Sequence, residues 1–94
     1  MITISVRYHS LLCRASGVAD EIVTLPLGTS LYGALEHLAQ GHGPSLRGML
    51  LGPGGVISPH LVVFRNGSLV SAEQRSFPLA DGDELMLFLA IAGG

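Results

Sequence analysis

Several residue types that most domains use freely are rare or missing in this sequence. It contains no lysine, no tryptophan and a single cysteine, Cys13, and charged residues make up only 13% of its 94 positions. One cysteine excludes an internal disulfide and any metal site built from cysteines. A formal net charge of -2 offers no basic surface for a nucleic-acid backbone. We therefore expect no nucleic-acid partner.

Long apolar runs are also missing. Hydrophobic residues make up 48% of the chain, but they come in short runs, far from the roughly 20 consecutive residues that a membrane-spanning helix needs. The N-terminus begins directly with a strand-like alternation and lacks the basic region of a secretory signal. Such a composition supports an ordinary buried core. We expect a single soluble domain over residues 1–94, located in the cytoplasm and without a membrane partner.

The N-terminal quarter of the chain has the pattern of two strands. From Ile2 to Val6, apolar side chains alternate with polar ones, which is the period of a half-buried strand. Residues 21–25 are rich in β-branched side chains and end at Pro26, so they predict a second strand that pairs with the first. Residues 8–17 have no clean period and predict an irregular connection.

One main helix is predicted next. Apolar positions between residues 31 and 38 fall on one helical face, Thr29 or Ser30 can cap its first turn, and the glycines at 41 and 43 can end it. The following segment, residues 41–59, is rich in glycine and proline. We expect the least regular part of the chain there, with at most one short helical turn over residues 45–51.

The last third of the sequence predicts a hairpin and a final strand. A strand over residues 60–65 is followed by Asn66-Gly67, two residues that tolerate positive φ and favour a tight hairpin turn. Leu69-Val70 would be the return strand. Residues 78–83 predict a turn and residues 84–89 the last strand, which can lie parallel to the first because a long crossover separates them. This is the β-grasp order, an α+β fold with a mixed sheet on one main helix.

The sequence ends in Gly93-Gly94 after a strand. Glycine weakens ordered structure, so we expect a flexible tail over residues 90–94. A Gly-Gly carboxylate is the least hindered acyl group that a chain can present, and it can enter a narrow channel in another protein. A frayed end without function is the alternative for the dipeptide taken alone.

Other groups that look like chemical sites fit structural roles better. Residues 81–84, Asp-Gly-Asp-Glu, have the composition of a tight turn and lack the further ligands of a divalent-ion site. The four histidines have no metal-ligand spacing, and we expect them at the surface or in loops. Residues 52–55 lack the Lys-Ser/Thr of a phosphate loop, and Cys13 has no identifiable base and is expected to fill space. No metal and no bound cofactor are predicted.

Several segments together resemble the MoaD/ThiS family, the small subunit of molybdopterin synthase and the sulfur carrier of thiazole synthesis. They are Val63–Val70, Leu79–Leu85 and Ile91–Gly94, with Leu25–Gly28 similar to the opening of the same family. The resemblance spans nearly the whole chain and is densest over its last third. It implies a ubiquitin-like β-grasp fold.

The resemblance also implies that the protein is a co-substrate and not an enzyme. An E1-like adenylyltransferase of the MoeB/ThiF type would use ATP to convert the Gly94 carboxylate to an acyl-adenylate. Sulfur from a persulfide donor would then replace AMP and leave a thiocarboxylate on Gly94. A synthase large subunit or another sulfur-accepting enzyme would consume it.

The destination of the sulfur stays open between pathways. Molybdopterin synthesis is the first expectation, although Leu89-Ala90 stands where its small subunits commonly have two prolines. The long segment 41–59 and the ending Ile91–Gly94 are similar to a carrier for cysteine synthesis. Thiazole carriers are usually shorter than this chain. A ubiquitin-like protein modifier and a plain β-grasp interaction module are further alternatives.

Alternation in the last strand predicts a docking surface. Residues 85, 87 and 89 share one face, while residues 86 and 88 share the other, and a sheet with one helix leaves this second face uncovered. By family position, Leu69 and Phe88 match residues that meet the partner. Ordinary strand residues half-covered by loops are the alternative. The predicted partner-binding residues are Leu69, Met86, Phe88 and Ile91.

The missing lysine has two explanations. The basic residues are Arg7, Arg14, Arg47, Arg65 and Arg75. A GC-rich genome favours arginine codons and would produce this bias without a functional reason. Alternatively, a protein with an activated C-terminus gains from having no side-chain amine for self-attack. The sequence is compatible with both.

Overall fold

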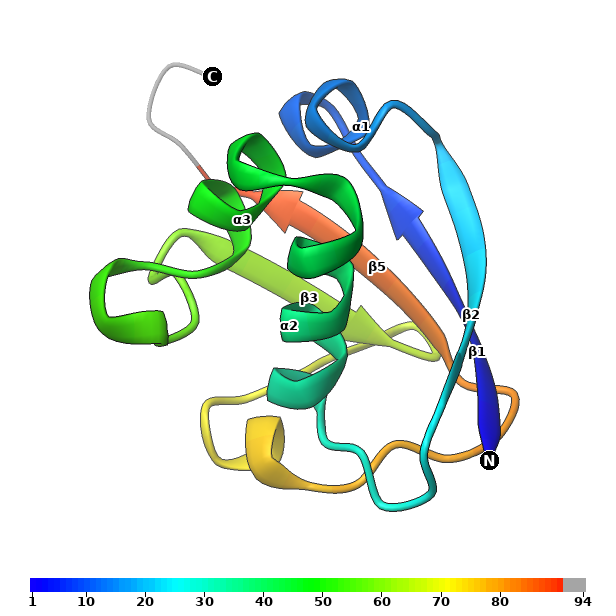
Figure 1. Cartoon of the computed structure of the whole chain (residues 1–94). Coiled ribbons are helices and arrows are strands. Elements are labelled where there is room, and N and C mark those ends of the chain that lie inside the picture. The colour runs from blue at the N-terminus through cyan, green and yellow to red at the C-terminus, as the bar shows by residue number, and fades with distance from the viewer. Residues whose placement is uncertain (91–94) are drawn as a thin grey trace.

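The computed structural model describes residues 1–90, which form a mixed five-stranded sheet with its helices on one face (Figure 1). The strands are β1 (Ile2–Tyr8), β2 (Asp20–Leu25), β3 (Leu61–Arg65), β4 (Ser68–Leu69) and β5 (Glu84–Leu89). The helices are α1 (Leu11–Ser16), α2 (Leu31–His42) and α3 (Pro44–Leu50), with 3-10 turns η1 (Pro53–Gly55) and η2 (Glu73–Ser76). Within residues 1–90, no helix has the length and apolar character to cross a membrane.

The strand order in the sheet is β2-β1-β5-β3-β4. β1 and β5 run parallel, with Val6 beside Leu85, and all other neighbours are antiparallel. The parallel pair is possible because the chain between its strands crosses over through the helices. The predicted β-grasp order is therefore confirmed, and β5 lies in the middle of the sheet.

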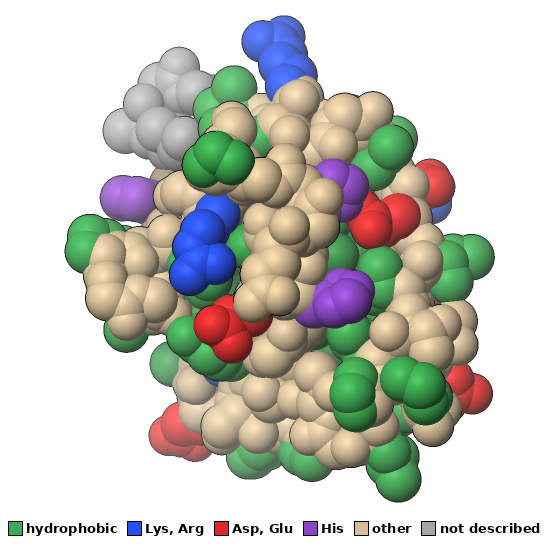
Figure 2. All heavy atoms as spheres, in the orientation of Figure 1, with side chains coloured by type: hydrophobic (Ala, Val, Ile, Leu, Met, Phe, Trp, Pro, Cys, Tyr) green, Lys and Arg blue, Asp and Glu red, His purple; other side chains and the backbone are tan. Residues whose placement is uncertain are grey.

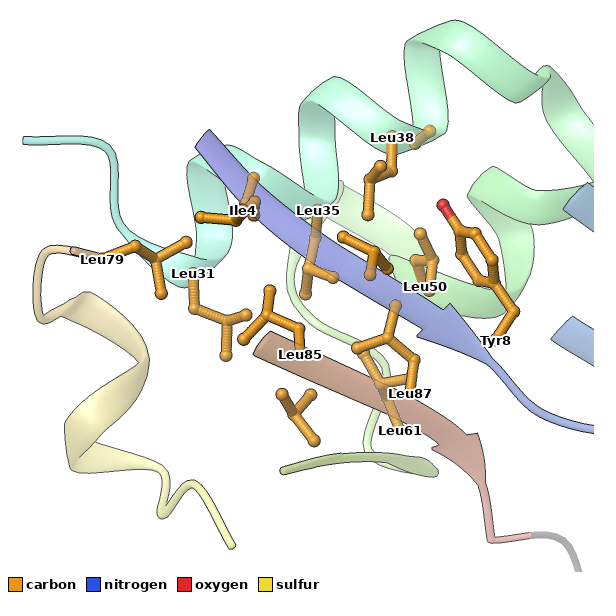
Figure 3. Packing of buried hydrophobic residues seen from close by; sticks show 14 of the residues in the cluster. Ile4, Tyr8, Leu31, Leu35, Leu38, Leu50, Leu61, Leu79, Leu85 and Leu87 are labelled. Carbon is orange, nitrogen blue, oxygen red and sulfur yellow. The ribbon is translucent and has the colours of Figure 1, made fainter. Parts of the chain in front are cut away.

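The core lies between the sheet and α2. The even-numbered residues of β1 are buried and the odd-numbered ones are exposed, as a half-buried strand requires. The apolar side of α2 packs onto this face (Figure 3), and each buried leucine or isoleucine contributes about 1.5–3 kcal/mol through the hydrophobic effect. Residues that meet there include Ile4, Leu31, Leu35, Leu85 and Leu87.

The predicted main helix is confirmed, and its cap is Ser30. The Ser30 hydroxyl accepts a hydrogen bond from the Gly33 N–H at 3.3 Å, whereas the Thr29 hydroxyl donates to the carbonyl of Pro26. The helix ends at Gly43. Its φ of 94° is positive, a conformation that glycine adopts readily and that is strained for other residues. Gly41 lies inside the last turn and does not end the helix.

Two helical segments were not predicted in full. Residues 11–16, expected within an irregular connection, form α1, whose one fully buried residue is Leu12. So short a helix with one buried position shows no period in the sequence. In the segment expected to be irregular, α3 spans seven residues and buries Leu46 and Leu50. Pro44 occupies its first turn, where proline is tolerated.

The hairpin and the last strand agree with the sequence. Asn66 and Gly67 have φ values of 51° and 84°, the left-handed pair that a type I′ turn requires. The return strand is β4, one residue earlier than predicted, and the Val70 N–H still donates to the Val63 carbonyl at 2.9 Å. β5 has the predicted bounds.

Candidate functional site

The residues with the strongest predicted role, Gly93 and Gly94, lie outside the described residues, as does Ile91. The site must therefore be built from the strand that leads to them and from the surface around that strand. Of the predicted tail, the structure describes only Ala90.

Ala90 is the last described residue, and it is fixed to the neighbouring strand. Its N–H donates to the His60 carbonyl at 2.7 Å, and Leu89 pairs with Leu61 immediately before it. The four residues that follow in the sequence can span at most about 14 Å when fully extended. The distance that the Gly94 carboxylate can cover is therefore measured from a fixed point at the end of β5.

An apolar surface lies beside this point, on the sheet face opposite the helices. Register pairs Val62 with Phe88, and Phe64 with both Met86 and Leu69. These five residues, which we name the apolar face, come from β3, β4 and β5. Leu69 is 62% exposed and the other four are partly exposed. The predicted residues Leu69, Met86 and Phe88 thus lie on one surface. Phe88 is the nearest of them to the root of the tail, two residues before Ala90.

The ring of Phe88 is held in place from two sides. The His9 imidazole stacks on it, with centroids 4.2 Å apart and planes 8° from parallel, and Phe64 contacts it edge-on at 5.8 Å. The backbone N–H of His9 donates to the Leu87 carbonyl at 3.2 Å. Both ring geometries are favourable for aromatic pairs, so the apolar face is preformed next to the tail.

His9 is a site residue that sequence reasoning missed. As expected, it lies in a loop, directly after β1, but its ring stacks on Phe88 of the apolar face. Its Nε2 is buried and has no hydrogen-bond partner within residues 1–90. The signal was available, since His9 continues the alternation of β1 one position beyond buried Tyr8.

The other half of the same sheet face is polar. It is hollowed between β2 and β5, where the small side chain of Ser5 is flanked in register by Ile22 and Glu84. Arg7 and Asp20 also line the hollow. The apolar face is therefore bordered by charged side chains toward β2, and it ends at the edge strand β4 on the other side.

The predicted turn at residues 81–84 has the structural role expected of it. Asp83 is only 6% exposed, and its carboxylate accepts hydrogen bonds from the Ala80 N–H and the Asn66 amide and pairs with Arg65 at 2.7 Å. Burial raises the pKa of Asp83, but these hydrogen bonds and the Arg65 charge outweigh it, so that its pKa lies below the usual value. Asp81 accepts from the Thr3 N–H at 2.7 Å.

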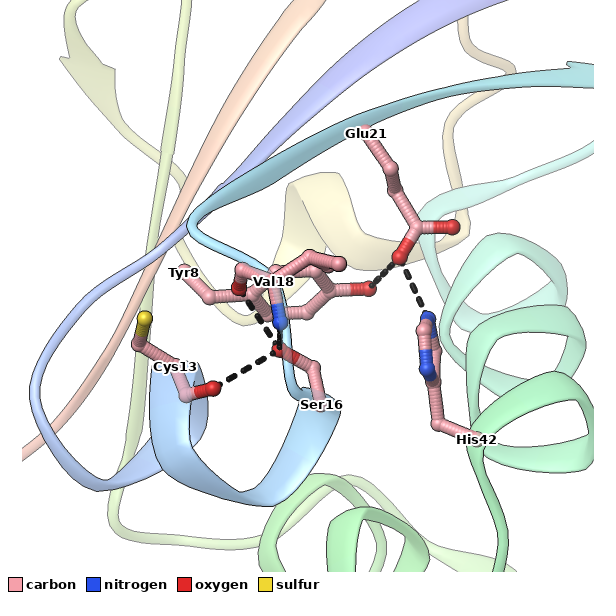
Figure 4. A network of polar contacts seen from close by, with 6 residues as sticks. All are labelled: Tyr8, Cys13, Ser16, Val18, Glu21 and His42. Atoms are coloured by element: carbon pink, nitrogen blue, oxygen red, sulfur yellow. Dashed lines mark hydrogen bonds and ion pairs between the residues drawn. The ribbon is translucent and has the colours of Figure 1, made fainter.

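A second polar network lies on the helix side, away from the apolar face (Figure 4). The Tyr8 hydroxyl donates to Glu21 Oε2 at 2.9 Å, and His42 Nε2 pairs with the same oxygen. Burial and the adjacent Glu21 carboxylate raise the pKa of Tyr8. The network joins β1, β2 and the end of α2, so His42 is a partly buried structural residue and not the surface or loop residue that we expected.

The remaining candidates fit structural roles. Cys13 packs against the core as a partly buried side chain, as predicted. In the part of the chain that the structure describes, no three His, Cys, Asp or Glu side chains form a group that could hold a metal ion.

Comparison with known proteins places this geometry in context. A family model described as the ThiS family matches residues 6–94. Among solved structures, SAMP1 from Haloferax volcanii is 27% identical, with 98% of this chain and 99% of that chain covered and a TM-score of 0.85. A protein described as molybdopterin converting factor, subunit 1, from Pyrococcus furiosus is 22% identical, with 97% and 100% covered and a TM-score of 0.77.

A more distant structure shares the same fold. Urm1 from Trypanosoma brucei is 20% identical, with 98% of this chain and 95% of that chain covered and a TM-score of 0.74. No curated protein sequence matches. These neighbours are ubiquitin-like β-grasp proteins, in agreement with the strand order described above.

Proposed function

The chain belongs to the ThiS family, and from that premise we propose that it is a sulfur carrier that works through Gly94. An E1-like adenylyltransferase of the MoeB/ThiF type activates the Gly94 carboxylate with ATP, forming the acyl-adenylate and releasing pyrophosphate. A persulfide sulfur then attacks the carbonyl carbon and AMP leaves. This leaves an acyl disulfide between Gly94 and the donor. A thiol then attacks the donor's sulfur, forms a disulfide with it, and releases Gly94 as a thiocarboxylate.

The observation that carries this proposal is the apolar face at the root of the tail. Large apolar side chains that remain exposed on a folded domain mark a surface for another protein. Phe88 of this surface lies two residues from Ala90, so a C-terminal segment that spans at most about 14 Å begins beside a partner that binds the apolar face. We assign partner binding to Leu69, Met86, Phe88 and Ile91, and the reacting acyl group to Gly93-Gly94.

The catalytic groups belong to the partner in this mechanism. Small carriers of the ThiS and MoaD type are generally not catalysts, and family members work with E1-like activating enzymes and synthase subunits. The groups that this chain contributes are an unhindered acyl carbon and a docking surface. The nucleophile and the stabilisation of developing charge come from the enzyme that holds it.

Molybdopterin synthesis is the first destination to test, with a synthase large subunit as the sulfur acceptor. This choice rests on the motifs at 63–70 and 79–85, with cysteine and thiazole synthesis as alternatives. A protein modifier is the second candidate function. It is favoured by the 27% identity to SAMP1, since another structure of that protein bears the name small archaeal modifier protein 1.

Intact-mass analysis separates these functions. The purified chain is incubated with the activating enzyme of its host, ATP and a persulfide donor, and we expect a mass gain equal to replacing one oxygen by sulfur. A variant lacking Gly94 should show no gain. If the enzyme releases pyrophosphate with another carrier of the same host but never with this chain, the sulfur-carrier proposal is wrong. Isopeptide-linked adducts on other proteins without a thiocarboxylate would favour the modifier.

A further inference from the structure

The sheet has two open edges, and they differ in length. The edge strand β4 has only two residues, and a very short edge strand is one way in which proteins avoid pairing with another chain. The other edge strand, β2, has six residues (Figure 1). Among the elements of residues 1–90, β2 packs extensively only against β1. The fold therefore leaves the outer edge of β2 without a neighbour.

The backbone of β2 directs the N–H and C=O groups of alternate residues outward. The Tyr8 N–H donates to the Ala19 carbonyl at 2.8 Å, just before β2 begins. Hydrogen-bonded and non-hydrogen-bonded pairs alternate along antiparallel strands, so residues 21, 23 and 25 bond to β1 and residues 20, 22 and 24 do not. In the described part of the chain, the outward backbone groups of residues 20, 22 and 24 have no hydrogen-bond partner. They are free to pair with a further strand.

The side chains of β2 do not protect this edge. The strand reads Asp-Glu-Ile-Val-Thr-Leu, with no lysine and no proline, and its register with β1 continues without a bulge. Lysine, proline and bulges are the usual features that keep an edge strand from pairing. Ile22 is 73% exposed, and hydrophobic side chains protrude along the margin of the molecule where β2 runs (Figure 2). An exposed β-branched residue in the middle of a free edge favours the addition of a strand.

The strand is complementary to a second copy of itself. In an antiparallel pair centred on Ile22, this residue faces Ile22 of the other copy, and each Asp20 faces a Thr24. Each of these pairs exchanges two hydrogen bonds, so every outward backbone group of residues 20, 22 and 24 is satisfied. A register shifted by two residues in either direction loses one of the pairs. The pairing pattern of β2 therefore selects one register.

The charges of β2 favour the same register. Asp20 stands opposite the Thr24 hydroxyl of the other copy, which is a favourable cross-strand pair. The two Asp20 residues are four positions apart along the paired strands, or about 14 Å. Glu21 lies on the helix side, where its carboxylate accepts a hydrogen bond from Tyr8 and pairs with His42. No like charges face each other directly in this arrangement.

We propose that β2 is a homodimer interface through which two copies of the chain form one continuous sheet. The two-fold axis of an antiparallel strand pair is perpendicular to the sheet, so the helices of both copies lie on one side and both apolar faces on the other. β1 separates β2 from β5 and β3 in the sheet, so each apolar face stays open. The dimer presents two docking surfaces on the same side, and its formation does not depend on the C-terminal residues.

Sedimentation equilibrium of the full chain tests this inference. A pair of six-residue strands buries less surface than a standard interface, so we expect the 9.8 kDa chain to approach twice that mass only at about 0.1–1 mM. Ile22→Lys should weaken the association at least about tenfold, because it places two positive charges opposite each other. Ile22→Val keeps a β-branched apolar side chain and should dimerise like the natural protein. Circular dichroism melts establish that both variants are folded.

Disulfide cross-linking tests the register. In a Cys13→Ala background, Ile22→Cys should form an intermolecular disulfide when oxidised glutathione accepts the electrons of the two thiols. The Cα atoms of a hydrogen-bonded pair lie about 5.5 Å apart, which suits a disulfide. Asp20→Cys is the matched control on the same strand. Its Cα atom lies about 14 Å from its copy, beyond the span of a disulfide, so this variant should stay uncross-linked.

Three results would overturn the inference. The first is a natural chain that remains monomeric up to about 1 mM, the concentration at which even a small interface associates. The second is a dimer that Ile22→Lys leaves intact, and its loss in Phe88→Ala would then place the contact on the apolar face. The third is cross-linking of Asp20→Cys as fast as that of Ile22→Cys, which would contradict the register.

Discussion

Neighbouring residues of β5 have opposite environments. Leu85 and Leu87 are fully buried under α2, whereas Met86 and Phe88 remain partly exposed on the other face. The uncovered face of a sheet with helices on one side ordinarily carries polar side chains. Exposure of these apolar side chains to water is therefore unfavourable in the free protein. A partner that covers them removes this unfavourable contribution.

Truncating the apolar face should weaken partner binding more than stability. For Leu69→Ala and Phe88→Ala, we expect a loss of about 2 kcal/mol each in affinity for the activating enzyme, the size of a binding hot spot. Isothermal titration calorimetry with the host's activating enzyme measures it. Leu27→Ala is the control, since Leu27 is 82% exposed but lies outside the apolar face. Equal affinities for all three variants would contradict the assignment.

Asp83 should make the protein sensitive to acid. Its folded-state pKa is lowered, so the carboxylate contributes stability that is fully present above its unfolded pKa of about 4 and is lost as the pH falls through the lower folded value. We expect Asp83→Asn to cost about 2 kcal/mol at neutral pH by breaking hydrogen bonds to a charged group, with a smaller difference from the natural protein below pH 4.

Urea unfolding at several pH values measures this dependence. Asp20→Asn serves as the control, because Asp20 is exposed and has no hydrogen bond or ion pair through its side chain in the described part of the chain. A stability difference for Asp83→Asn that stays constant from neutral to acid pH would show that the carboxylate charge is not its source.

At the scale of elements, α3 contributes more to the hydrophobic core than the sequence pattern suggested. It contributes Leu46 and Leu50 to the core and is followed by buried Leu51, although glycine and proline surround it. We expect Leu50→Ala to destabilise the protein by about 2–5 kcal/mol, the cost of a large-to-small change in a closed core. Thermal unfolding measures it against Val56→Ala, an exposed position just beyond the helix. Similar melting temperatures for the two variants would mean that α3 is not part of the cooperative unit.

The elements that the sequence predicted are those with a strong local signal. β1 shows alternation over seven residues, α2 has an apolar face and a serine cap, and Asn66-Gly67 allows hardly any other turn. α1 and α3 are short. α1 packs against α3 and β5, and α3 packs against α1 and the adjacent α2. Tertiary packing overrides the weak local pattern there, and no periodicity argument could reveal it.

The residues of the candidate site also fall into those that a local pattern predicts and those that only the tertiary structure explains. Alternation was enough to place Met86 and Phe88 on one face, and the hairpin register brought Leu69 beside them. The stacking of His9 on Phe88 depends on the parallel neighbourhood of β1 and β5. This contact follows from the strand order of the whole sheet, so local sequence patterns alone do not predict it.

At the scale of the whole molecule, the fold keeps the start of the C-terminal segment at a fixed position. β5 is the central strand, hydrogen-bonded on both sides, and the Ala90 N–H is fixed to His60. The docking surface and the root of the tail therefore have a constant separation. The number of residues between Ala90 and Gly94 then sets how far the acyl group extends from a docked partner.

Shortening this spacer should abolish sulfur loading while leaving the fold and the apolar face unchanged. Deleting Ile91 and Ala92 keeps Gly93-Gly94 but brings the carboxylate about 7 Å closer to the sheet, so it no longer reaches the active site of a partner bound to the apolar face. We expect pyrophosphate release by the activating enzyme to fall at least about a hundredfold, since positioning errors of a few ångströms carry penalties of this order.

The matched control is Ile91→Ala, which keeps the spacer length and shortens only the isoleucine side chain. Its activation should stay within about tenfold of the natural chain, the contribution of a single peripheral apolar contact. Unfolding curves of both variants should coincide with that of the natural protein, because neither change touches residues 1–90. If the shortened chain is activated as well as the control, then the fixed root at Ala90 does not set the reach, and the partner must hold the carrier by a surface other than the apolar face.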